Sequence, residues 1–292
     1  MATLSQWVAG ARPRTLPAAV APVVLGTAAA HLAGSADLAL AILALLVALG
    51  LQVGVNYAND YSDGIRGTDE ARVGPVRLVG QRLAAPSNVR LAAFLLFAAA
   101  GVVGLALVAL SGAWIMLPLG VLAVLAAWRY TGGDNPYGYR GLGEVYVFVF
   151  FGLMATLGTE FPQAGVVSWV GVLGAVGVGA IASAILVANN LRDIPTDEVT
   201  GKRTLAVRLG DRGTRILYVS LVLVALAVVA AIAVTHPWAL LALAAFALAV
   251  LPVKAVASGA TGRDLVPALA GTGIFELAYA VLLAVGVWLS TR

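Results

Sequence analysis

The sequence has no cysteine, only two histidines and few charged residues. Of its 292 residues, 11% are charged and 61% are hydrophobic. Without cysteine, disulfide bonds, thiolate metal sites, Fe–S clusters and cysteine nucleophiles are excluded. His31 and His236 are too few and too far apart in sequence to suggest a haem or zinc site. A water-soluble fold is also excluded, because soluble domains are about 25% charged and expose mostly polar side chains.

Long apolar runs are what the sequence has instead. These runs are continuously apolar and rich in Ala, Leu and Val, which is typical of transmembrane helices and not of the alternating strands of a β-barrel. We therefore predict an all-α, polytopic membrane protein of about nine transmembrane helices, forming a single intramembrane domain over residues 1–292. The nine runs cover roughly residues 15–34, 36–59, 86–110, 113–130, 143–161, 166–190, 212–234, 237–257 and 265–289.

The positive charges predict an orientation in the membrane. With nine helices, all of the 18 Lys and Arg residues except Arg292 fall on one side. The side enriched in Lys and Arg is the cytoplasm. We therefore expect a cell (inner or plasma) membrane protein with a cytoplasmic N-terminus and two long cytoplasmic loops, 60–85 and 191–211. The net charge of +4 then reflects topology, and we expect no nucleic acid partner.

Polar residues recur at helical spacing where the second predicted helix reaches the cytoplasm. Asn56, Asp60 and Asp63 are separated by four and three residues, so they share one helix face. Asn59 lies beside them. Two glycines follow, and the turn that they permit brings Asp69 back toward the same face. We call these residues the first aspartate array.

The sixth predicted helix ends in a matching way. Asn189, Asp193 and Asp197 follow one another in steps of four, and we call them the second aspartate array. Pro195 is expected to interrupt the helix between the two aspartates. Because the arrays lie four helices apart, the chain resembles two four-helix units in the same orientation, about 1–130 and 140–257, with a ninth helix appended at 265–289.

Convergence of the two arrays predicts a metal site. Two like charges about 4 Å apart near a protein surface repel by roughly 4 kcal/mol. A hard divalent cation removes this repulsion, and Mg²⁺ is commonly shared between one or two carboxylates and a substrate phosphate. Basic residues in the adjoining loops suit the remaining phosphate oxygens. The alternative, that these are solvated loop carboxylates paired with arginine, agrees less well with two matched arrays.

At these residues the sequence resembles the UbiA superfamily of intramembrane aromatic prenyltransferases. That family has an Asn-Asp-x-x-Asp motif after its second helix and an Asp-x-x-x-Asp motif after its sixth. Here they correspond to Asn59-Asp60…Asp63, with Asp69 beyond, and to Asp193…Asp197. The resemblance covers the whole chain and is greatest to the branch that prenylates 1,4-dihydroxy-2-naphthoate in menaquinone synthesis. The matching stretches are 11–17, 59–64, 67–69, 74–77, 137–144, 189–193 and 201–210.

The resemblance implies a reaction and a set of site residues. A polyprenyl group passes from polyprenyl diphosphate to 1,4-dihydroxy-2-naphthoate, with loss of CO₂ and diphosphate, in a central cavity open to the lipid bilayer; the product is demethylmenaquinone. The implied catalytic residues are Asp60, Asp63, Asp193, Asp197 and Lys202, and the same four aspartates with Asp69 are the implied Mg²⁺ ligands. Diphosphate binding is implied for Asn56, Asn59, Arg66, Arg77, Asn189, Lys202 and Arg203. Binding of the aromatic acceptor is implied for Arg14, Thr15, Tyr139 and Arg140.

Two other functions remain open at the level of sequence. One is transfer to another acceptor, such as 4-hydroxybenzoate. The other is secondary transport, with which the repeats and Glu276 in the middle of the ninth run are compatible. Transporters, however, place coupling residues near the midplane, whereas the arrays lie at helix ends.

Glu144 opens the fifth run, where a carboxylate suits the helix dipole or a cavity equally well. The sequence does not indicate an oligomeric state.

Overall fold

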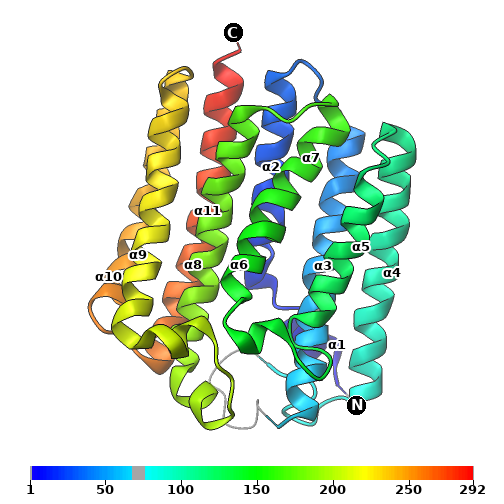
Figure 1. The fold of residues 1–292 in the computed structure, drawn as a ribbon, viewed down its shortest axis with the longest axis vertical. Coiled ribbons are helices and arrows are strands. Elements are labelled where there is room, and N and C mark those ends of the chain that lie inside the picture. Colours follow the sequence, from blue (N-terminus) through cyan, green and yellow to red (C-terminus); the bar gives the residue numbers. More distant parts are fainter. Residues whose placement is uncertain (1, 68–75, 292) are drawn as a thin grey trace.

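A computed structural model describes residues 2–67 and 76–291, and these residues form helices and turns without a strand. The long helices pack side by side in one bundle (Figure 1). In chain order the elements are α1 (Leu4–Gly10), η1 (Pro13–Thr15), α2 (Pro17–Leu32), α3 (Leu38–Ile65), α4 (Pro86–Ser111), α5 (Met116–Arg129), η2 (Tyr137–Arg140), α6 (Gly143–Val147), η3 (Phe148–Met154), α7 (Ala155–Ala164), α8 (Trp169–Val199), α9 (Leu205–Ala233), η4 (Pro237–Ala245), α10 (Phe246–Ala257), η5 (Gly262–Leu265) and α11 (Val266–Leu289).

The helices confirm a multi-pass membrane protein, but they do not confirm nine spans. Within the described ranges, seven helical segments are long and apolar enough to cross a membrane. The predicted runs 15–34 and 113–130 correspond to the shorter helices α2 and α5. Together α1 and η1 form one bent pair with α2, with a 48° bend, and counting that pair as a span gives eight. The bend lies where Pro17 begins α2 and an arginine in the left-handed region precedes η1.

Both helices that carry the aspartate arrays are longer than predicted. α3 continues to Ile65 and α8 to Val199, so the described residues of both arrays lie on helices. Pro195 lies inside α8 and does not end it, which corrects the expected interruption. The Thr196 hydroxyl donates to the carbonyl of Asp193 (2.9 Å), and the N–H of Lys202 donates to the carbonyl of Asp197 (2.8 Å). These bonds hold the last turns where proline has removed one donor.

α8 is the central scaffold of the bundle. It packs against α9 along its length and also contacts α2, η3 and α11. Small residues permit this close approach: a Cβ on Gly152 of η3 would lie 2.6 Å from the Cα of Gly179 on α8. α3 packs mainly against α4. The array-bearing ends of α3 and α8 both lie at the end of the bundle near α1, whereas α11 ends at the opposite end (Figure 1).

Candidate active site

A cavity of about 860 Å³ separates α3 from α8 and extends between α4, α5 and α7. Its two ends differ in chemistry. Near the array-bearing ends of α3 and α8 the wall is polar and charged, and toward the other end of the bundle it is apolar. Of the residues implied by the family resemblance, the cavity is lined by Thr15, Asn56, Asn59, Asp63, Arg77, Tyr139, Asn189, Asp197 and Lys202. Residues that line its apolar end include Ala44, Val47, Leu107, Met116, Met154 and Gly158.

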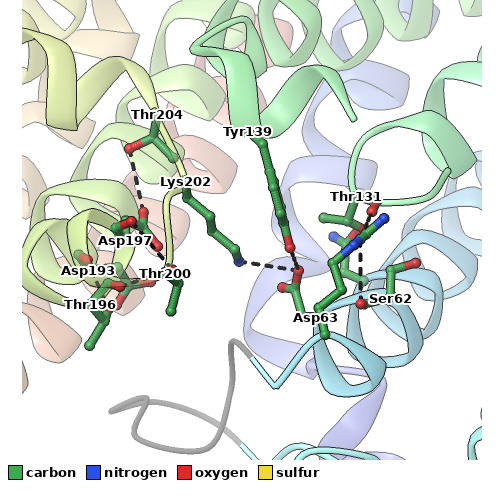
Figure 2. A network of polar contacts seen from close by, with 12 residues as sticks. Ser62, Asp63, Thr131, Tyr139, Asp193, Thr196, Asp197, Thr200, Lys202 and Thr204 are labelled. Atoms are coloured by element: carbon green, nitrogen blue, oxygen red, sulfur yellow. Dashed lines mark hydrogen bonds and ion pairs between the residues drawn. The ribbon is translucent and has the colours of Figure 1, made fainter. Parts of the chain in front are cut away.

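Asp63 joins the first array to the chain that follows the second. The ammonium Nζ of Lys202 lies 3.2 Å from Oδ1 of Asp63, and the Tyr139 hydroxyl donates to the same oxygen at 2.6 Å. Lys202 also lies 4.5 Å from the centroid of the Tyr139 ring. All three side chains converge on one point between the two helix ends (Figure 2). This contact therefore brings α3 and the α8–α9 connection to the same mouth of the cavity.

Asp197 is the aspartate of the second array that lines the cavity. The Thr204 hydroxyl donates to its Oδ2 over 3.4 Å. The same hydroxyl accepts from the N–H of Val207 and caps α9. The end of α8 and the start of α9 are thus held together beside the charged wall.

Asp60 does not line the cavity. Its carboxylate is fully buried and accepts two backbone hydrogen bonds, from the N–H of Leu78 (2.6 Å) and of Val79 (3.0 Å). The segment that returns from the long loop approaches closely here, since a Cβ on Gly64 would lie 2.5 Å from the Cβ of Val79. Arg77 directly precedes this pair and lines the cavity. The geometry therefore gives Asp60 the role of an anchor for the segment that carries Arg77.

Asp193 likewise lies off the cavity wall. It forms a two-point pair with its neighbour Arg192, Nε to Oδ1 at 2.7 Å and Nη2 to Oδ2 at 2.8 Å. Nη2 also donates to Oδ1 of Asn189 (2.8 Å). Both partners of the pair are buried. Of its described aspartates, each array therefore turns one toward the cavity and one toward the protein.

The predicted single cluster of carboxylates is not formed by the aspartates that the structure describes. In residues 2–67 and 76–291, no group of three or more His, Cys, Asp or Glu is placed to hold a metal ion; Asp69 lies outside these residues. The reason is that Asp60 and Asp193 do not line the cavity and instead bind groups of the protein. The cavity still offers an all-oxygen donor set from Asp63, Asp197 and the neighbouring amides. This set fits Mg²⁺, which needs only one or two protein carboxylates when substrate phosphates complete its shell.

Two of the four predicted basic residues reach the cavity, Arg77 and Lys202. Arg66 is exposed and donates to the carbonyls of Thr131 and Gly133, so it ties the end of α3 to the loop before η2. Arg203 is also exposed, and its N–H donates to the carbonyl of Tyr139 (3.0 Å). These two arginines connect loops and do not line the site.

The predicted acceptor-binding residues divide in the same way. Thr15 and Tyr139 line the cavity, whereas Arg14 and Arg140 are exposed and do not line it. Arg12, which sequence reasoning missed, lines the cavity in place of Arg14. Its backbone lies in the left-handed region (φ 54°), a conformation uncommon outside glycine that turns the chain into η1. No sequence pattern indicates this turn.

An aromatic row that sequence reasoning also missed lines the cavity. The rings of Tyr137 and Tyr146 stack with centroids 3.8 Å apart, and Phe150 follows at 5.9 Å from Tyr146. The Tyr137 hydroxyl donates to the carbonyl of Ala126 (2.9 Å), and burial raises its pKa, so the phenol stays neutral. The i, i+4 spacing of Tyr146 and Phe150 was the available signal.

Glu144 and Glu276, the two glutamates singled out in the sequence, are both buried but have different surroundings. Glu144 accepts from the Nδ2 of Asn190 (2.9 Å), a residue that lines the cavity, so Glu144 supports the wall from behind. Glu276 is fully buried on α11, does not line the cavity, and has no hydrogen-bond partner for either carboxyl oxygen among the described residues. The structure gives Glu276 no part in the site.

Fold and site together define a multi-pass membrane protein, helical in its described residues, with a cavity that joins a charged mouth to an apolar interior. The model of the UbiA prenyltransferase family matches residues 19–266. The chain belongs to this family. It is 53% identical over 284 residues to the 1,4-dihydroxy-2-naphthoate octaprenyltransferase of Mycobacterium tuberculosis, covering 97% of each chain. It is 40% identical to the enzyme of the same name from Escherichia coli, covering 72% of this chain and 70% of that one.

Solved structures with low sequence identity share the fold. A UbiA homologue from Aeropyrum pernix without ligand superposes with a TM-score of 0.70 at 17% identity, covering 94% of this chain and 98% of the other. A UbiA homologue from Archaeoglobus fulgidus bound to GPP and Mg²⁺ has a TM-score of 0.66 at 12% identity, covering 95% and 99%.

Proposed function

We propose that this chain transfers a polyprenyl group from polyprenyl diphosphate to 1,4-dihydroxy-2-naphthoate, releasing CO₂ and diphosphate and giving demethylmenaquinol, the hydroquinone form of demethylmenaquinone. The relatives of this name and the family match support the proposal. The observation that carries it is the single cavity with Asp63, Asp197 and Lys202 at one end and an apolar wall at the other. A diphosphate and a polyprenyl tail need these two environments in one continuous space.

Asp63 and Asp197 would hold Mg²⁺ at the charged mouth, and oxygens of the substrate diphosphate would complete its shell. When bound, Mg²⁺ supplies Lewis-acid stabilisation of the leaving diphosphate. The Nζ of Lys202 and the guanidinium of Arg77 donate to the phosphate oxygens and share the charge that develops there. For this, Lys202 exchanges its bond to Asp63 for bonds to the substrate.

Cleavage of the bond between C1 and the diphosphate oxygen leaves its electron pair on the oxygen and an allylic cation on the prenyl chain. The electron-rich naphthoate ring attacks C1, and departure of CO₂ returns an electron pair to the ring. The aromatic row of Tyr137, Tyr146 and Phe150 lies beside this path and presents ring faces instead of water. Ring faces favour a nearby positive charge.

We place the charged mouth at the cytoplasmic face of the cell membrane, with the N-terminus on the same side. The distribution of Lys and Arg supports this orientation. An anionic, water-soluble acceptor then reaches the mouth from the cytosol, and the polyprenyl donor reaches the apolar end from the bilayer.

The decisive experiment uses the purified protein with labelled octaprenyl diphosphate and separate acceptors, with and without EDTA. We expect a product with the mass of prenylated, decarboxylated naphthoate, and we expect EDTA to abolish its formation. Transfer to 4-hydroxybenzoate in preference to 1,4-dihydroxy-2-naphthoate would replace the proposed acceptor. Absence of transfer to any acceptor, with uptake of a solute into proteoliposomes, would overturn the enzymatic function.

A further inference from the structure

A glutamine in the cavity wall points to a contact that selects the acceptor. We propose that Gln52 binds the aromatic acceptor, its side-chain carbonyl oxygen accepting a hydrogen bond from a phenolic hydroxyl of the ring. The proposal rests on the function given above and deepens it by assigning a specificity-determining residue.

A hydrogen-bond network fixes the direction of the Gln52 amide. The Thr15 hydroxyl has one hydrogen, which it donates to the carbonyl of Arg12 (2.9 Å). Its oxygen can then only accept, and it does so from Nε2 of Gln52 (2.9 Å) and Nδ2 of Asn56 (3.0 Å). The nitrogen of the Gln52 amide therefore faces Thr15, and its oxygen faces away from that network.

The oxygen of that amide has no protein donor in the described part of the chain. Gln52 is 5% exposed and lines the cavity, and no hydrogen bond reaches Oε1. Buried polar atoms are normally paired, with protein, water or ligand. Asn56, which lies one turn away on the same face, uses its amide nitrogen for both Thr15 and the carbonyl of Ala11. Gln52 thus places a buried amide oxygen, without a donor among the described residues, in the wall of the space in which substrates meet.

The chemistry of the acceptor substrate matches this oxygen. An amide carbonyl accepts a hydrogen bond and repels a carboxylate, so the hydroxyl and not the acid group of the naphthoate belongs here. The 1-hydroxyl lies next to the carboxylate and shares its hydrogen with it, which leaves the 4-hydroxyl free to donate. A phenol that donates a hydrogen bond has a more electron-rich ring, which favours attack on the prenyl cation.

The position of Gln52 along α3 also suits binding of the acceptor. Gln52 lies seven residues from Asn59 and 11 from Asp63, which is about 10 Å and about 16 Å along the helix. The hydroxyl would therefore be held deeper in the cavity than the diphosphate. Arg12, in the turn that Thr15 anchors, lines the same cavity and offers a guanidinium for the substrate carboxylate.

The test compares two ligands that differ only in the 4-hydroxyl. Binding of 1,4-dihydroxy-2-naphthoate and of 1-hydroxy-2-naphthoate is measured without oxygen and without prenyl donor, on protein in lipid nanodiscs. Wild-type protein is expected to bind the dihydroxy compound at least tenfold more tightly, and Gln52→Met is expected to reduce this ratio to within twofold. The matched control is Gln163→Met, which changes a glutamine of α7 outside the cavity and keeps the wild-type ratio.

A merely structural role for Gln52 weakens both ligands equally, and an unchanged ratio would overturn the proposal. So would a wild-type protein that binds the two compounds equally well. If Gln52→Met does not fold, Gln52→Leu gives the same comparison. The proposed function fails separately, when wild-type protein forms no prenylated naphthoate, whatever the binding ratio.

Discussion

The two aspartate arrays lie at equivalent helix ends beside one cavity, yet they neutralise their buried aspartates by different means. Asp60 accepts two backbone N–H groups from a returning loop, whereas Asp193 pairs with the guanidinium next to it in sequence. In each array the other described aspartate, Asp63 or Asp197, lines the cavity. Helical spacing therefore groups the aspartates, but the surroundings divide them into one that faces substrate and one that holds structure.

The cavity-facing aspartates also differ from each other. Asp63 receives a hydrogen bond of 2.6 Å from Tyr139 and the ammonium of Lys202 at 3.2 Å. Asp197 receives a longer bond of 3.4 Å from Thr204. The Tyr139 bond to Asp63 is thus expected to contribute more than the Thr204 bond to Asp197. Substitutions in both arrays can test the difference between the buried aspartates and the difference between the cavity-facing ones.

The largest effect is expected for the two cavity-facing aspartates. Asp63→Asn and Asp197→Asn each keep the side-chain shape and remove a negative charge from the proposed diphosphate site. We expect kcat/KM to fall about a thousandfold in each, or roughly 4 kcal/mol of transition-state stabilisation. The measurement is product formation at saturating Mg²⁺, with size-exclusion profile and apparent Tm as controls for folding.

Equal activity of either variant and the wild-type protein would remove that aspartate from the mechanism. The comparison is sharpened by Asp193→Asn under the same conditions, because that carboxylate does not line the cavity. If Asp193→Asn were as inactive as Asp197→Asn while fully folded, the assignment of one functional and one structural aspartate to each array would be wrong.

The next largest effect is on stability. Asp193→Leu leaves the buried guanidinium of Arg192 without its main partner, and we expect a loss of about 3 kcal/mol, at the lower end for breaking a buried ion pair. The double variant Arg192→Met/Asp193→Leu removes both charges and is expected to recover most of this loss. Apparent Tm of the single and double variants measures the coupling. The second single variant is Arg192→Met. A double variant less stable than both single variants would show that other contacts of Arg192 or Asp193 also contribute to stability.

Hydropathy predicts most of the helices, because burial in lipid requires long apolar runs. It places the ends of α3 and α8 too early, since polarity begins at the arrays while backbone hydrogen bonding continues for several more residues. Spacing alone also groups Asp60 with Asn56, because residues four apart share a face. What separates them in the structure is the backbone of Leu78 and Val79, whose approach no local pattern encodes.

Prediction from the sequence has the same limit for the residues that bind the aromatic acceptor. The basic stretch before the first helix is visible in the sequence, but which arginine reaches the cavity depends on the left-handed backbone of Arg12. The direction of the Gln52 amide has a similar cause, since it depends on Thr15, which lies 37 residues away in sequence. Composition and spacing therefore locate the charged mouth, and tertiary contacts decide its members.

A smaller effect is expected where backbone groups are the partner. Asp60→Asn keeps one acceptor oxygen and turns an NH₂ group toward a backbone N–H, which costs about 2 kcal/mol of stability. The returning segment then holds Arg77 less well, so we expect the KM for the prenyl donor to rise about tenfold while kcat changes less. No double variant can test this contact as it can the Arg192–Asp193 pair, because the partners of Asp60 are backbone N–H groups. A donor KM equal to the wild-type value would exclude the anchoring role.

The smallest effects test the difference between the Tyr139 bond to Asp63 and the Thr204 bond to Asp197. Tyr139→Phe removes the bond of 2.6 Å to Asp63 but keeps the ring beneath Lys202, and we expect kcat to fall about tenfold, or roughly 1.4 kcal/mol. Thr204→Val removes the bond of 3.4 Å to Asp197, and since so long a bond contributes little, we expect activity within about threefold of wild type. Both are measured as kcat and KM for each substrate, and the Thr204 variant is also checked by apparent Tm because this residue caps α9. If Thr204→Val proved the more damaging to kcat at unchanged Tm, the Thr204 bond to Asp197 would matter more for activity than the Tyr139 bond to Asp63.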